Sequence, residues 1–581
     1  MNRTSTKLLL SAMIISSFIF TISRSAYSQW SGNPAINLKV CDTTNEQVLV
    51  KISPTTDGGC YLSWFDGRSS GYAVYFQRLD ASGNKQFASA GLLVSNNPQN
   101  SSLVDYDLKT DASNNAVIAF TDIRNAGQIN PFAYLISPTG SFLWGNNGVT
   151  LSTATTVFQA NPKIAVTSDG NYIIAWSYGS SPKTIALQKL NSSGVKQWGT
   201  DPIFLAGSGT ENFDYPDLVP SDNGNVILLW SGYSGSFLNP VNYRLYTQKF
   251  SSSGTPVWNG SMDTVYGTGY VSGYYTPRIF SDGNNGAIYC WRDYRGNANY
   301  QTGYIQRINS SGTFQFPVNG SAVSTLAGNN HFDPVACVSS TGETYSIWYE
   351  TNNLQSQYGV YGQKFSTNGT RQWTDNGHTF VALNANQPSI MSVYSKNGNM
   401  LAYYMESQSG NNTFIKSFMS DGSGNLGWGG VILVPSSYLS PKLRLNTTIN
   451  SSGMSMLAWQ DNRNDGGGIY AQNINLDGSF GNTLGITGIS GTAPKEFSLS
   501  QNFPNPFNPS TEIKFDIAKL SNVKLNIYNV LGEKIALLVD QNLPAGSYSV
   551  NWDASEMPSG VYFYKIYAGD FSATKKLILI K

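Results

Sequence analysis

The stretch from Pro162 to Trp198 reads PKIAVTSDGNYIIAWSYGSSPKTIALQKLNSSGVKQW. A turn of the Ser-Asp-Gly-Asn type precedes a strand that ends in Trp176, and a Gln-Lys-Leu strand follows it. A Ser-Gly turn then leads to a further aromatic residue, Trp198. Short apolar runs bounded by Gly, Asn and Ser clusters predict β-strands joined by tight turns. With its neighbours, the stretch therefore predicts one sheet of four short strands.

This unit recurs between Gln29 and about Gly491. The strand-ending aromatic returns at a spacing close to 56 residues, at Trp64, Phe120, Trp176, Trp230, Trp291, Trp348, Tyr404 and Trp459. Four units also carry a proline 14 residues before that aromatic, at Pro162, Pro216, Pro277 and Pro334. A single four-stranded unit cannot bury both faces of its sheet, so the units must stack around an axis. The repeat predicts an all-β chain whose main part is a β-propeller.

The last unit lacks its final aromatic strand after Gly478, whereas Gln29-Trp30-Ser31 near the N-terminus matches Gln197-Trp198-Gly199. We therefore expect the N-terminal segment to complete the last unit and close the ring. Eight units predict an eight-bladed propeller. A seven-bladed ring with one divergent unit stays open as an alternative, because the seventh and eighth units fit the pattern less tightly.

The C-terminal 85 residues carry a different set of motifs, in order. They are Gln501-Asn502-Phe503-Pro504-Asn505-Pro506-Phe507-Asn508-Pro509, then Ile527 to Gly532, Ala545-Gly546-Ser547-Tyr548, Trp552-Asp553-Ala554, Ser559-Gly560-Val561-Tyr562, and Lys575-Lys576 before the end. Six segments between Thr511 and Ile580 alternate apolar with polar residues, which predicts a small antiparallel sandwich. Prolines 504, 506 and 509 cannot donate to a ladder and hold the first motif extended along an edge.

These motifs closely resemble the C-terminal sorting domain, type A, of the type IX secretion system (Por secretion system) of Bacteroidetes-like bacteria. The resemblance implies a small immunoglobulin-like β-sandwich recognised by the outer-membrane translocon and the associated sortase machinery. The residues that carry it are Pro504, Asn505, Pro506, Phe507, Asn508, Pro509, Gly532, Gly546, Trp552, Gly560, Tyr562 and Lys576. It implies export through the periplasm to the outer-membrane surface or the medium, and it leaves the activity of the exported part open.

The N-terminus has the features of a secretory signal peptide. Arg3 and Lys7 precede an apolar run from Leu8 to Ile22, and Ala26-Tyr27-Ser28 forms a small-x-small cleavage site. We thus expect a signal peptide at 1–28, a propeller of about eight repeats at 29–491, and a linker with the sorting domain at 492–581. Without residues 1–28 the chain has 33 basic and 35 acidic residues. This balance disfavours nucleic acid as a partner, and no transmembrane segment is expected in the mature chain.

Cysteines and metal ligands give few functional signals. Cys41 with Cys60 and Cys290 with Cys337 are candidate disulfides, and four buried free thiols are an equal alternative. His331 and His378 are the two histidines and lie in non-equivalent segments, so no metal site, catalytic triad or cofactor is predicted. Arg463 takes a ligand position in the calcium-loop-like segment Asp461 to Gly466, which disfavours calcium there.

An acidic residue follows two positions after the repeat aromatic in six units, at Asp66, Asp122, Asp293, Glu350, Glu406 and Asp461. Arginine stands two positions later in four of them, at Arg68, Arg124, Arg295 and Arg463. A group repeated in nearly every unit indicates repeated structural ion pairs, because a single active site would break the symmetry. We therefore predict no catalytic residues among them.

The repeat symmetry is broken between Trp230 and Trp291, where the spacing grows to 61 residues. The added loops are expected on one face and carry Tyr233, Phe237, Tyr266, Tyr270, Tyr274, Tyr275, Tyr294 and Tyr300, with asparagines among them. Aromatic rings beside amide side chains suit sugar or peptide faces. We take these residues as a candidate ligand-binding patch, with packing of long loops as the equal alternative.

Three classes of function follow. The favoured one is an exported, non-enzymatic binding or interaction module with a glycan or protein ligand. A glycan-processing hydrolase or lyase is the first alternative. A glycosidase would need two carboxylates that face each other, with candidates among Glu211, Asp214, Glu350 and Glu406. A structural surface or adhesion component is the second.

Overall fold

The structure is a computed structural model and describes residues 30–581 except positions 70, 100–103, 126–127, 155, 237–238, 261, 270, 272–275, 296–298, 409–410, 465, 482–486, 491–493 and 555–556. The predicted signal peptide and the predicted domain boundary near 491 therefore lie outside the described residues. The described chain forms forty strands and one short 3-10 turn, Asp222–Gly224. It is all-β, with ten four-stranded antiparallel sheets.

Eight of these sheets follow one another along the chain, and four come from its first half. Sheet 1 contains β2 (Gln47–Pro54), β3 (Cys60–Ser69), β4 (Gly71–Leu79) and β5 (Leu92–Gln99). Sheet 2 contains β6 (Asp107–Thr110), β7 (Ala116–Asn125), β8 (Gln128–Ile136) and β9 (Val149–Thr150). Sheet 3 contains β10 (Gln159–Val166), β11 (Tyr172–Tyr178), β12 (Thr184–Leu190) and β13 (Ile203–Leu205). Sheet 4 contains β14 (Asn212–Pro220), β15 (Val226–Ser236), β16 (Asn239–Phe250) and β17 (Asp263–Gly269).

The next four sheets keep the same order. Sheet 5 contains β18 (Arg278–Ser281), β19 (Ala287–Asp293), β20 (Thr302–Ile308) and β21 (Ser321–Ala322). Sheet 6 contains β22 (Asn330–Val338), β23 (Thr344–Thr351), β24 (Tyr358–Phe365) and β25 (His378–Asn384). Sheet 7 contains β26 (Gln387–Lys396), β27 (Asn399–Ser407), β28 (Thr413–Ser420) and β29 (Leu433–Ser436). Sheet 8 contains β30 (Lys442–Ile449), β31 (Ser455–Asp461), β32 (Gly468–Ile474) and β1 (Leu38–Cys41).

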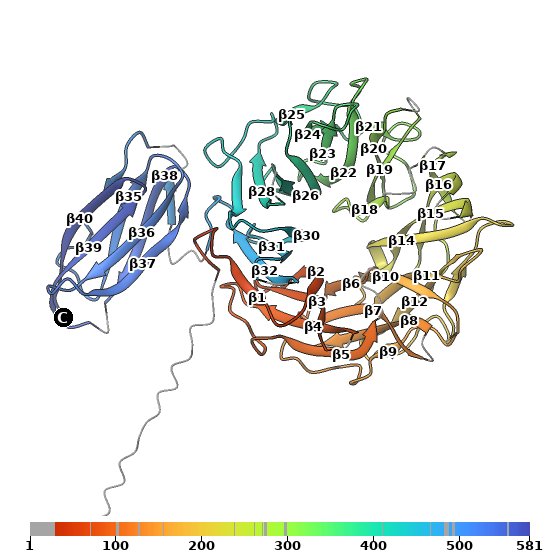
Figure 1. Ribbon diagram of the computed structural model, residues 1–581, viewed down its shortest axis with the longest axis horizontal. Coiled ribbons are helices and arrows are strands. Elements are labelled where there is room, and N and C mark those ends of the chain that lie inside the picture. Colours follow the sequence, from red (N-terminus) through yellow and green to blue (C-terminus); the bar gives the residue numbers. More distant parts are fainter. Residues whose placement is uncertain are drawn as a thin grey trace, which may run out of the picture.

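The eight sheets form a closed ring, with the first strand of each sheet nearest its centre (Figure 1). Each of these innermost strands contacts the innermost strands of both neighbouring sheets, and β30 of sheet 8 contacts β2 of sheet 1. The ring is closed by the chain itself, because β1 from the N-terminal segment pairs with β32 as the outer strand of sheet 8. The expected exchange of the N-terminal strand is therefore confirmed, and the arrangement is propeller-like.

Apolar packing between neighbouring sheets holds the ring together. The tryptophans of the repeat are among the largest fully buried side chains: Trp64, Trp176, Trp230, Trp348 and Trp459. Between sheets 2 and 3, for example, Val117 and Ala133 belong to the same core cluster as Tyr172 and Trp176. Sheet-on-sheet burial of this kind is the main stabilising term in such a ring.

The second aromatic of the repeat ties each sheet to the next. Trp144 Nε1 donates to Ser192 O at 3.0 Å, and Trp198 Nε1 donates to Ser252 O at 3.1 Å. Trp258, Trp373 and Trp428 make the corresponding bond to the following turn. Trp30 Nε1 donates in the same way to Ala81 O at 3.0 Å, so the N-terminal segment supplies this bond for the last sheet.

The glutamine of the repeat is buried because it organises the turn after its strand. Gln188 is fully buried, and its Oε1 accepts hydrogen bonds from the backbone N–H groups of Lys189 and Trp198. Gln77, Gln248, Gln306 and Gln363 make the same two acceptor contacts. A buried amide is stable only when its polar atoms are paired, which explains why glutamine recurs here.

The remaining two sheets lie in the C-terminal region. One contains β33 (Thr487–Ser490), β38 (Gly546–Asp553), β35 (Ser510–Ile517) and β34 (Ser498–Leu499). The other contains β37 (Lys534–Leu543), β36 (Ser521–Tyr528), β39 (Gly560–Ala568) and β40 (Phe571–Leu579). The two sheets share one apolar core, which includes Phe515, Leu525 and Tyr564. The six strands expected between Thr511 and Ile580 are all present, and β33 and β34 are additional.

Candidate functional site

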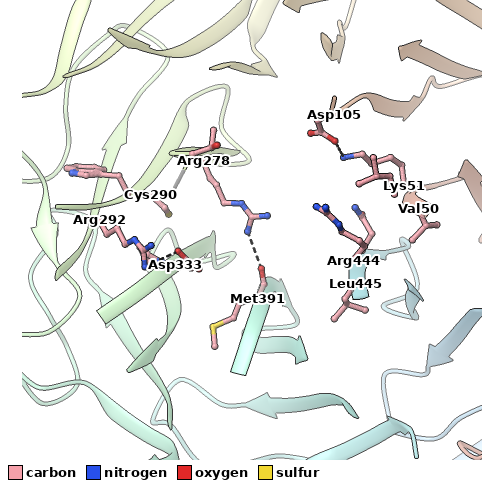
Figure 2. Close-up of a pocket in the computed structure, with 15 residues that line it drawn as sticks. Val50, Lys51, Asp105, Arg278, Cys290, Arg292, Asp333, Met391, Arg444 and Leu445 are labelled. Atoms are coloured by element: carbon pink, nitrogen blue, oxygen red, sulfur yellow. Dashed lines mark hydrogen bonds and ion pairs between the residues drawn. The ribbon is translucent and has the colours of Figure 1, made fainter. Parts of the chain in front are cut away.

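A cavity of about 470 Å³ lies at the centre of the ring, where the innermost strands begin (Figure 2). Its lining comes from the first strands of sheets 1, 5, 6, 7 and 8, from β19, the second strand of sheet 5, and from the segments before β6 and β18: Leu49, Val50, Lys51, Asp105, Thr276, Arg278, Cys290, Trp291, Arg292, Asp333, Pro334, Met391, Arg444, Leu445 and Asn446. We call this cavity the central pocket. Lys51, Arg278 and Asn446 also line a second cavity of about 620 Å³ further along the axis.

Bulges in the innermost strands shape the mouth of the central pocket. The register between first and second strands shifts in sheets 1, 3, 4, 6, 7 and 8. In five of these sheets a non-glycine residue sits at the bulge with positive φ: Leu49 (56°), Asn161 (56°), Tyr215 (54°), Asp333 (51°) and Arg444 (58°). This conformation is uncommon for bulky residues, and bulges re-aim side chains near binding sites.

The bulges also explain the repeated proline. Pro162, Pro216 and Pro334 each directly follow the residue of positive φ. A bulge leaves one residue of the strand outside the ladder, so a residue without an N–H group is tolerated there. The proline thus marks the point at which each innermost strand bends at the pocket.

Two lysines share one carboxylate at the wall of the pocket. Lys51 Nζ lies 2.6 Å from Asp105 Oδ1, and Lys163 Nζ lies 2.5 Å from Asp105 Oδ2. Burial alone would raise the pKa of Asp105, but the two ammonium charges outweigh it and hold that pKa well below its usual range. Burial lowers the pKa of Lys51, and repulsion from Lys163 adds to this effect. Asp105 is therefore fully engaged by cations.

Asp333, the second acidic residue of the lining, is also engaged. Arg292 Nη1 lies 3.5 Å from Asp333 Oδ1, and its guanidinium stacks over the ring of Phe332 at 4.2 Å. Burial lowers the pKa of Arg292 to about 10 and raises the pKa of Asp333, which the positive charges of Arg292 and Arg278 partly offset. Neither carboxylate of the lining is left to neutralise further cations.

Arg278 and Arg444 are the remaining cations, and both are exposed within the ring. Figure 2 shows their guanidinium groups extending into the cavity from opposite sides. Arg278 Nη1 donates to Met391 O at 3.2 Å. Among the described residues neither guanidinium forms an ion pair with a carboxylate. The four cations of the lining against Asp105 and Asp333 give the pocket a net charge of +2.

The predicted aromatic patch is only partly open to test. Phe237, Tyr270, Tyr274 and Tyr275 lie outside the described residues. Tyr233 and Tyr266 are 2% and 0% exposed, so the expectation that they stand on the surface is wrong. The ring of Tyr233 stacks on Tyr243 at 5.6 Å, and Tyr266 packs on Trp291 at 5.9 Å, because both belong to the sheet interior. Tyr294 and Tyr300 are half-buried and stay candidates.

The four carboxylates considered for glycan hydrolysis do not meet in the central pocket. Glu211, Asp214, Glu350 and Glu406 are all absent from its lining. Asp214 pairs with Lys183 at 2.5 Å, and Glu406 lies 3.6 Å from Lys416. Glu350 accepts a hydrogen bond from Asn329 at 2.7 Å, and Glu211 accepts one from Tyr246 at 3.0 Å. Each carboxylate therefore has a local structural partner.

The repeated acidic residues form structural ion pairs, as predicted. Asp293 Oδ2 lies 2.6 Å from Arg295 Nη2 and accepts a hydrogen bond from Trp291 Nε1 at 2.9 Å. Asp66 with Arg68, Asp122 with Arg124, and Asp461 with Arg463 form the same pair. The buried aspartate thus links the end of the second strand to the repeat tryptophan.

The cysteines are free thiols. Cys41, Cys60 and Cys290 are buried and Cys337 is half-buried, and neither candidate disulfide is formed. Burial raises the pKa of Cys41 to about 11 and the pKa values of the other three still further. Within the described part of the chain, no group of three metal-ligating side chains is present. No helix in that part is long and apolar enough to cross a membrane.

The sorting motifs mainly build the C-terminal fold. Phe507 packs on Trp552, which packs in turn on Tyr562, with ring centroids 5.5 Å apart in both pairs. Asn505 Oδ1 accepts a hydrogen bond from the N–H of Ile578 at 2.9 Å. Gly532 has a φ of 79°, which glycine adopts without strain. Pro504, Pro506, Asn508, Pro509, Gly560 and Lys576 are exposed.

Comparison with known proteins identifies the C-terminal region. Residues 501–581 match the family of secretion system C-terminal sorting domains. This match indicates export through the type IX secretion system to the cell surface or outer membrane, and interaction with the secretion machinery. No curated protein matches the chain.

Similar solved structures include two polysaccharide-active proteins. A polysaccharide lyase of family PL25, an ulvan lyase, has a TM-score of 0.41 and 10% identity over 77% of this chain and 96% of its own. The α-L-arabinanase of Penicillium chrysogenum complexed with arabinobiose has a TM-score of 0.31 and 13% identity over 54% of this chain and 92% of its own. At these TM-scores the likeness carries no information about a substrate.

Sequence reasoning missed the central pocket, although a signal for it was present. The residue 13 positions before the repeat aromatic is Lys51, Asp107, Lys163, Asp217, Arg278, Val335, Met391 and Asn446 in successive units. Each of the eight lies on or at the bend of an innermost strand. The charges alternate through the first five units, and counting back from the aromatic would have exposed this pattern.

Proposed function

We propose that this chain is an exported cell-surface or secreted β-propeller protein that binds a ligand in the central pocket. In this proposal the eight sheets are the blades of an eight-bladed propeller at residues 29–491. A signal peptide at 1–28 precedes it. A linker and a type A sorting domain with an immunoglobulin-like sandwich follow at 492–581 and engage the translocon and sortase machinery.

One observation carries the proposal: Arg278 and Arg444 point into the central pocket and form no ion pair among the described residues. Ligand pockets of several hundred Å³ with a few convergent polar groups are typical binding sites.

The lining favours binding over catalysis. A glycosidase needs two carboxylates, one as acid and one as base or nucleophile. The two carboxylates of the lining, Asp105 and Asp333, are each engaged by arginine or lysine. This disfavours the hydrolase alternative. The hydrolase, lyase and structural alternatives are outcomes of the test below. Tyr294 and Tyr300 are proposed to extend the binding surface beyond the pocket.

The test is a screen of the full mature chain against immobilised polysaccharides and glycans, with retention and released sugar recorded together. Retention without release is expected. Release of sugar would replace the binding module with a glycan-processing enzyme. Failure to be retained on any member of the panel would favour the structural component.

A further inference from the structure

The cations of the central pocket divide into two groups by their partners. Lys51 and Lys163 share Asp105, and Arg292 lies beside Asp333. Each of these three cations therefore has a carboxylate beside it without any ligand. Arg278 of sheet 5 and Arg444 of sheet 8 extend their guanidinium groups into the cavity.

Arg278 is oriented by one hydrogen bond, which does not use all of its N–H donors. Its Nη1 donates to the carbonyl of Met391 at 3.2 Å, which fixes the direction of the side chain across sheet 6 to sheet 7. A guanidinium has five N–H donors, so most of them stay directed at the cavity. This carbonyl contact orients the group without forming an ion pair, although the charge of Arg278 acts on Asp333, where it partly offsets the raised pKa of that carboxyl group.

Arg444 has an unfavourable backbone conformation. Its φ of 58° is one that glycine or asparagine adopts more readily. The side chain is exposed in the ring and makes no hydrogen bond or ion pair with another described residue. The same positive φ occurs at the bulges of four other sheets, so the strain belongs to the bulge; a group that binds from outside would explain the long cation with no internal partner.

We propose that Arg278 and Arg444 together clamp an oxyanion group, a carboxylate or a sulfate, of an acidic sugar that enters the central pocket. This rests on the proposed function of the pocket as a ligand site. Planar guanidinium groups bind two-oxygen anions through paired hydrogen bonds. Two such groups extending from opposite sides of the cavity offer donors to both sides of one anion. The net charge of +2 in the lining of the pocket favours anions over neutral or cationic ligands.

The size of the pocket restricts what enters. A cavity of about 470 Å³ lies at the small end of the range for ligand sites.

The experiment measures binding of the full mature chain by calorimetry to four probes at low salt. The probes are a glucuronate-bearing oligosaccharide, a sulfated oligosaccharide, a neutral oligosaccharide of equal length, and inorganic sulfate. We expect one of the acidic oligosaccharides to bind at least about tenfold more tightly than the neutral one. The first two probes separate carboxylate from sulfate as the source of the anion, and the fourth shows whether the free ion suffices.

Three variants locate the binding. Arg278→Gln and Arg444→Gly should each weaken the acidic probe about tenfold or more. Arg244→Ala removes an exposed arginine of β16 that does not line the pocket, and should leave the affinity unchanged. Thermal unfolding of each variant checks that the fold is intact. Arg444→Gly relieves the positive φ, so a loss of binding there cannot be ascribed to misfolding.

The outcomes separate the two proposals. If a probe binds but the double variant of Arg278 and Arg444 keeps full affinity, or the neutral probe binds equally well, the oxyanion clamp is overturned while the binding function stands. If no saccharide or sulfate probe binds the unaltered chain at all, and the polysaccharide screen is negative, both proposals fall.

Discussion

Asn37 Nδ2 donates a hydrogen bond to Gln472 Oε1 at 3.1 Å, although the two residues are 435 positions apart. Asn37 also accepts from Ser436 Oγ at 2.7 Å, and Gln472 Nε2 donates to Ser31 O at 2.7 Å. These contacts stabilise the docking of the N-terminal segment with β1 onto sheet 8. They therefore stabilise the closure of the ring.

The ring closure predicts a marked loss of stability for Asn37→Ala. The substitution leaves Gln472 and Ser436 with buried polar atoms unpaired, which costs about 1–3 kcal/mol in free energy of unfolding. Urea denaturation would measure the loss. Lys39→Ala, an exposed change two residues further along in β1, should shift the free energy by less than about 0.5 kcal/mol. Equal effects of the two substitutions would contradict this account of closure.

We expect the substitution of a buried repeat aspartate to lower stability more than the substitution of an exposed, paired aspartate. Asp293→Asn removes one charge from a pair whose aspartate is fully buried, and we expect a loss of about 3 kcal/mol. Asp375→Asn is the matched control, because Asp375 pairs with Arg371 at 3.0 Å but is 75% exposed. That change should cost less than about 1 kcal/mol. Chemical denaturation of both variants tests the difference, and ligand binding should be unaffected by either.

The free thiols predict slow reaction in the folded protein. With thiol pKa values raised by burial, Ellman's reagent at pH 8 should react with none of the four cysteines rapidly. In guanidinium without reductant, all four should react. Two reactive thiols in the denatured, unreduced protein would show that one of the disulfides Cys41–Cys60 and Cys290–Cys337 is formed. No reactive thiols would show that both are formed.

His331 predicts a pH dependence of stability. Its imidazole is fully buried with Nε2 3.6 Å from Glu350 Oε2, and burial lowers the pKa of His331 from 6.5 to about 4. Because the folded state favours the neutral form, its contribution is present above pH 6.5 and is lost as the pH falls toward 4. The loss amounts to about 3 kcal/mol at the lower end.

Glu350 opposes this effect, because burial raises its pKa and its protonation stabilises the folded state as the pH falls. The measurement is therefore the difference in free energy of unfolding between the unaltered chain and His331→Gln, which keeps Glu350. We expect the difference to shrink between pH 7 and pH 4.5. A difference that stays constant over this range would show that His331 does not remain neutral in the folded protein.

At the strained bulge of Arg444, we expect a substitution by glycine to raise stability while it weakens binding. Arg444→Gly should raise the free energy of unfolding by up to about 1 kcal/mol, because glycine adopts a φ of 58° without strain. Arg444→Ala keeps the strain and should not raise it. At Arg278, which has no such φ, glycine should lower stability by about 0.5–1 kcal/mol. Thermal and urea unfolding of the three variants test this.

Much of the fold could be predicted because its determinants are local and repeated. The strand-ending aromatics, the turn glycines and the glutamines recur at one spacing, and each copy is buried in the same way in its own sheet. The match of Trp30 with Trp198 predicted the closing segment, and both indoles donate to the next turn. The C-terminal motifs similarly combine an aromatic core with fixed turns, and they were recognised as a unit.

The site could not be predicted in the same way. Tyr233 looked like a loop aromatic, but it stacks on Tyr243 of the neighbouring strand inside sheet 4. Arg278 and Arg444 belong to different repeats and share no motif, so nothing along the chain relates them. Only the closure of the ring brings their strands to one cavity.

The sequence by itself therefore determined the all-β repeat, the closing N-terminal segment, the structural role of the repeated aspartates and the export route. Each of these depends on residues close together in the chain or on a spacing that recurs. The tertiary structure alone decided which side chains face the axis, which charges are already paired there, and which two arginines stay unpaired in the central pocket. The physical reason is that charge compensation depends on distances across the ring, and these are set by the packing of eight sheets and by the bulges that bend their innermost strands.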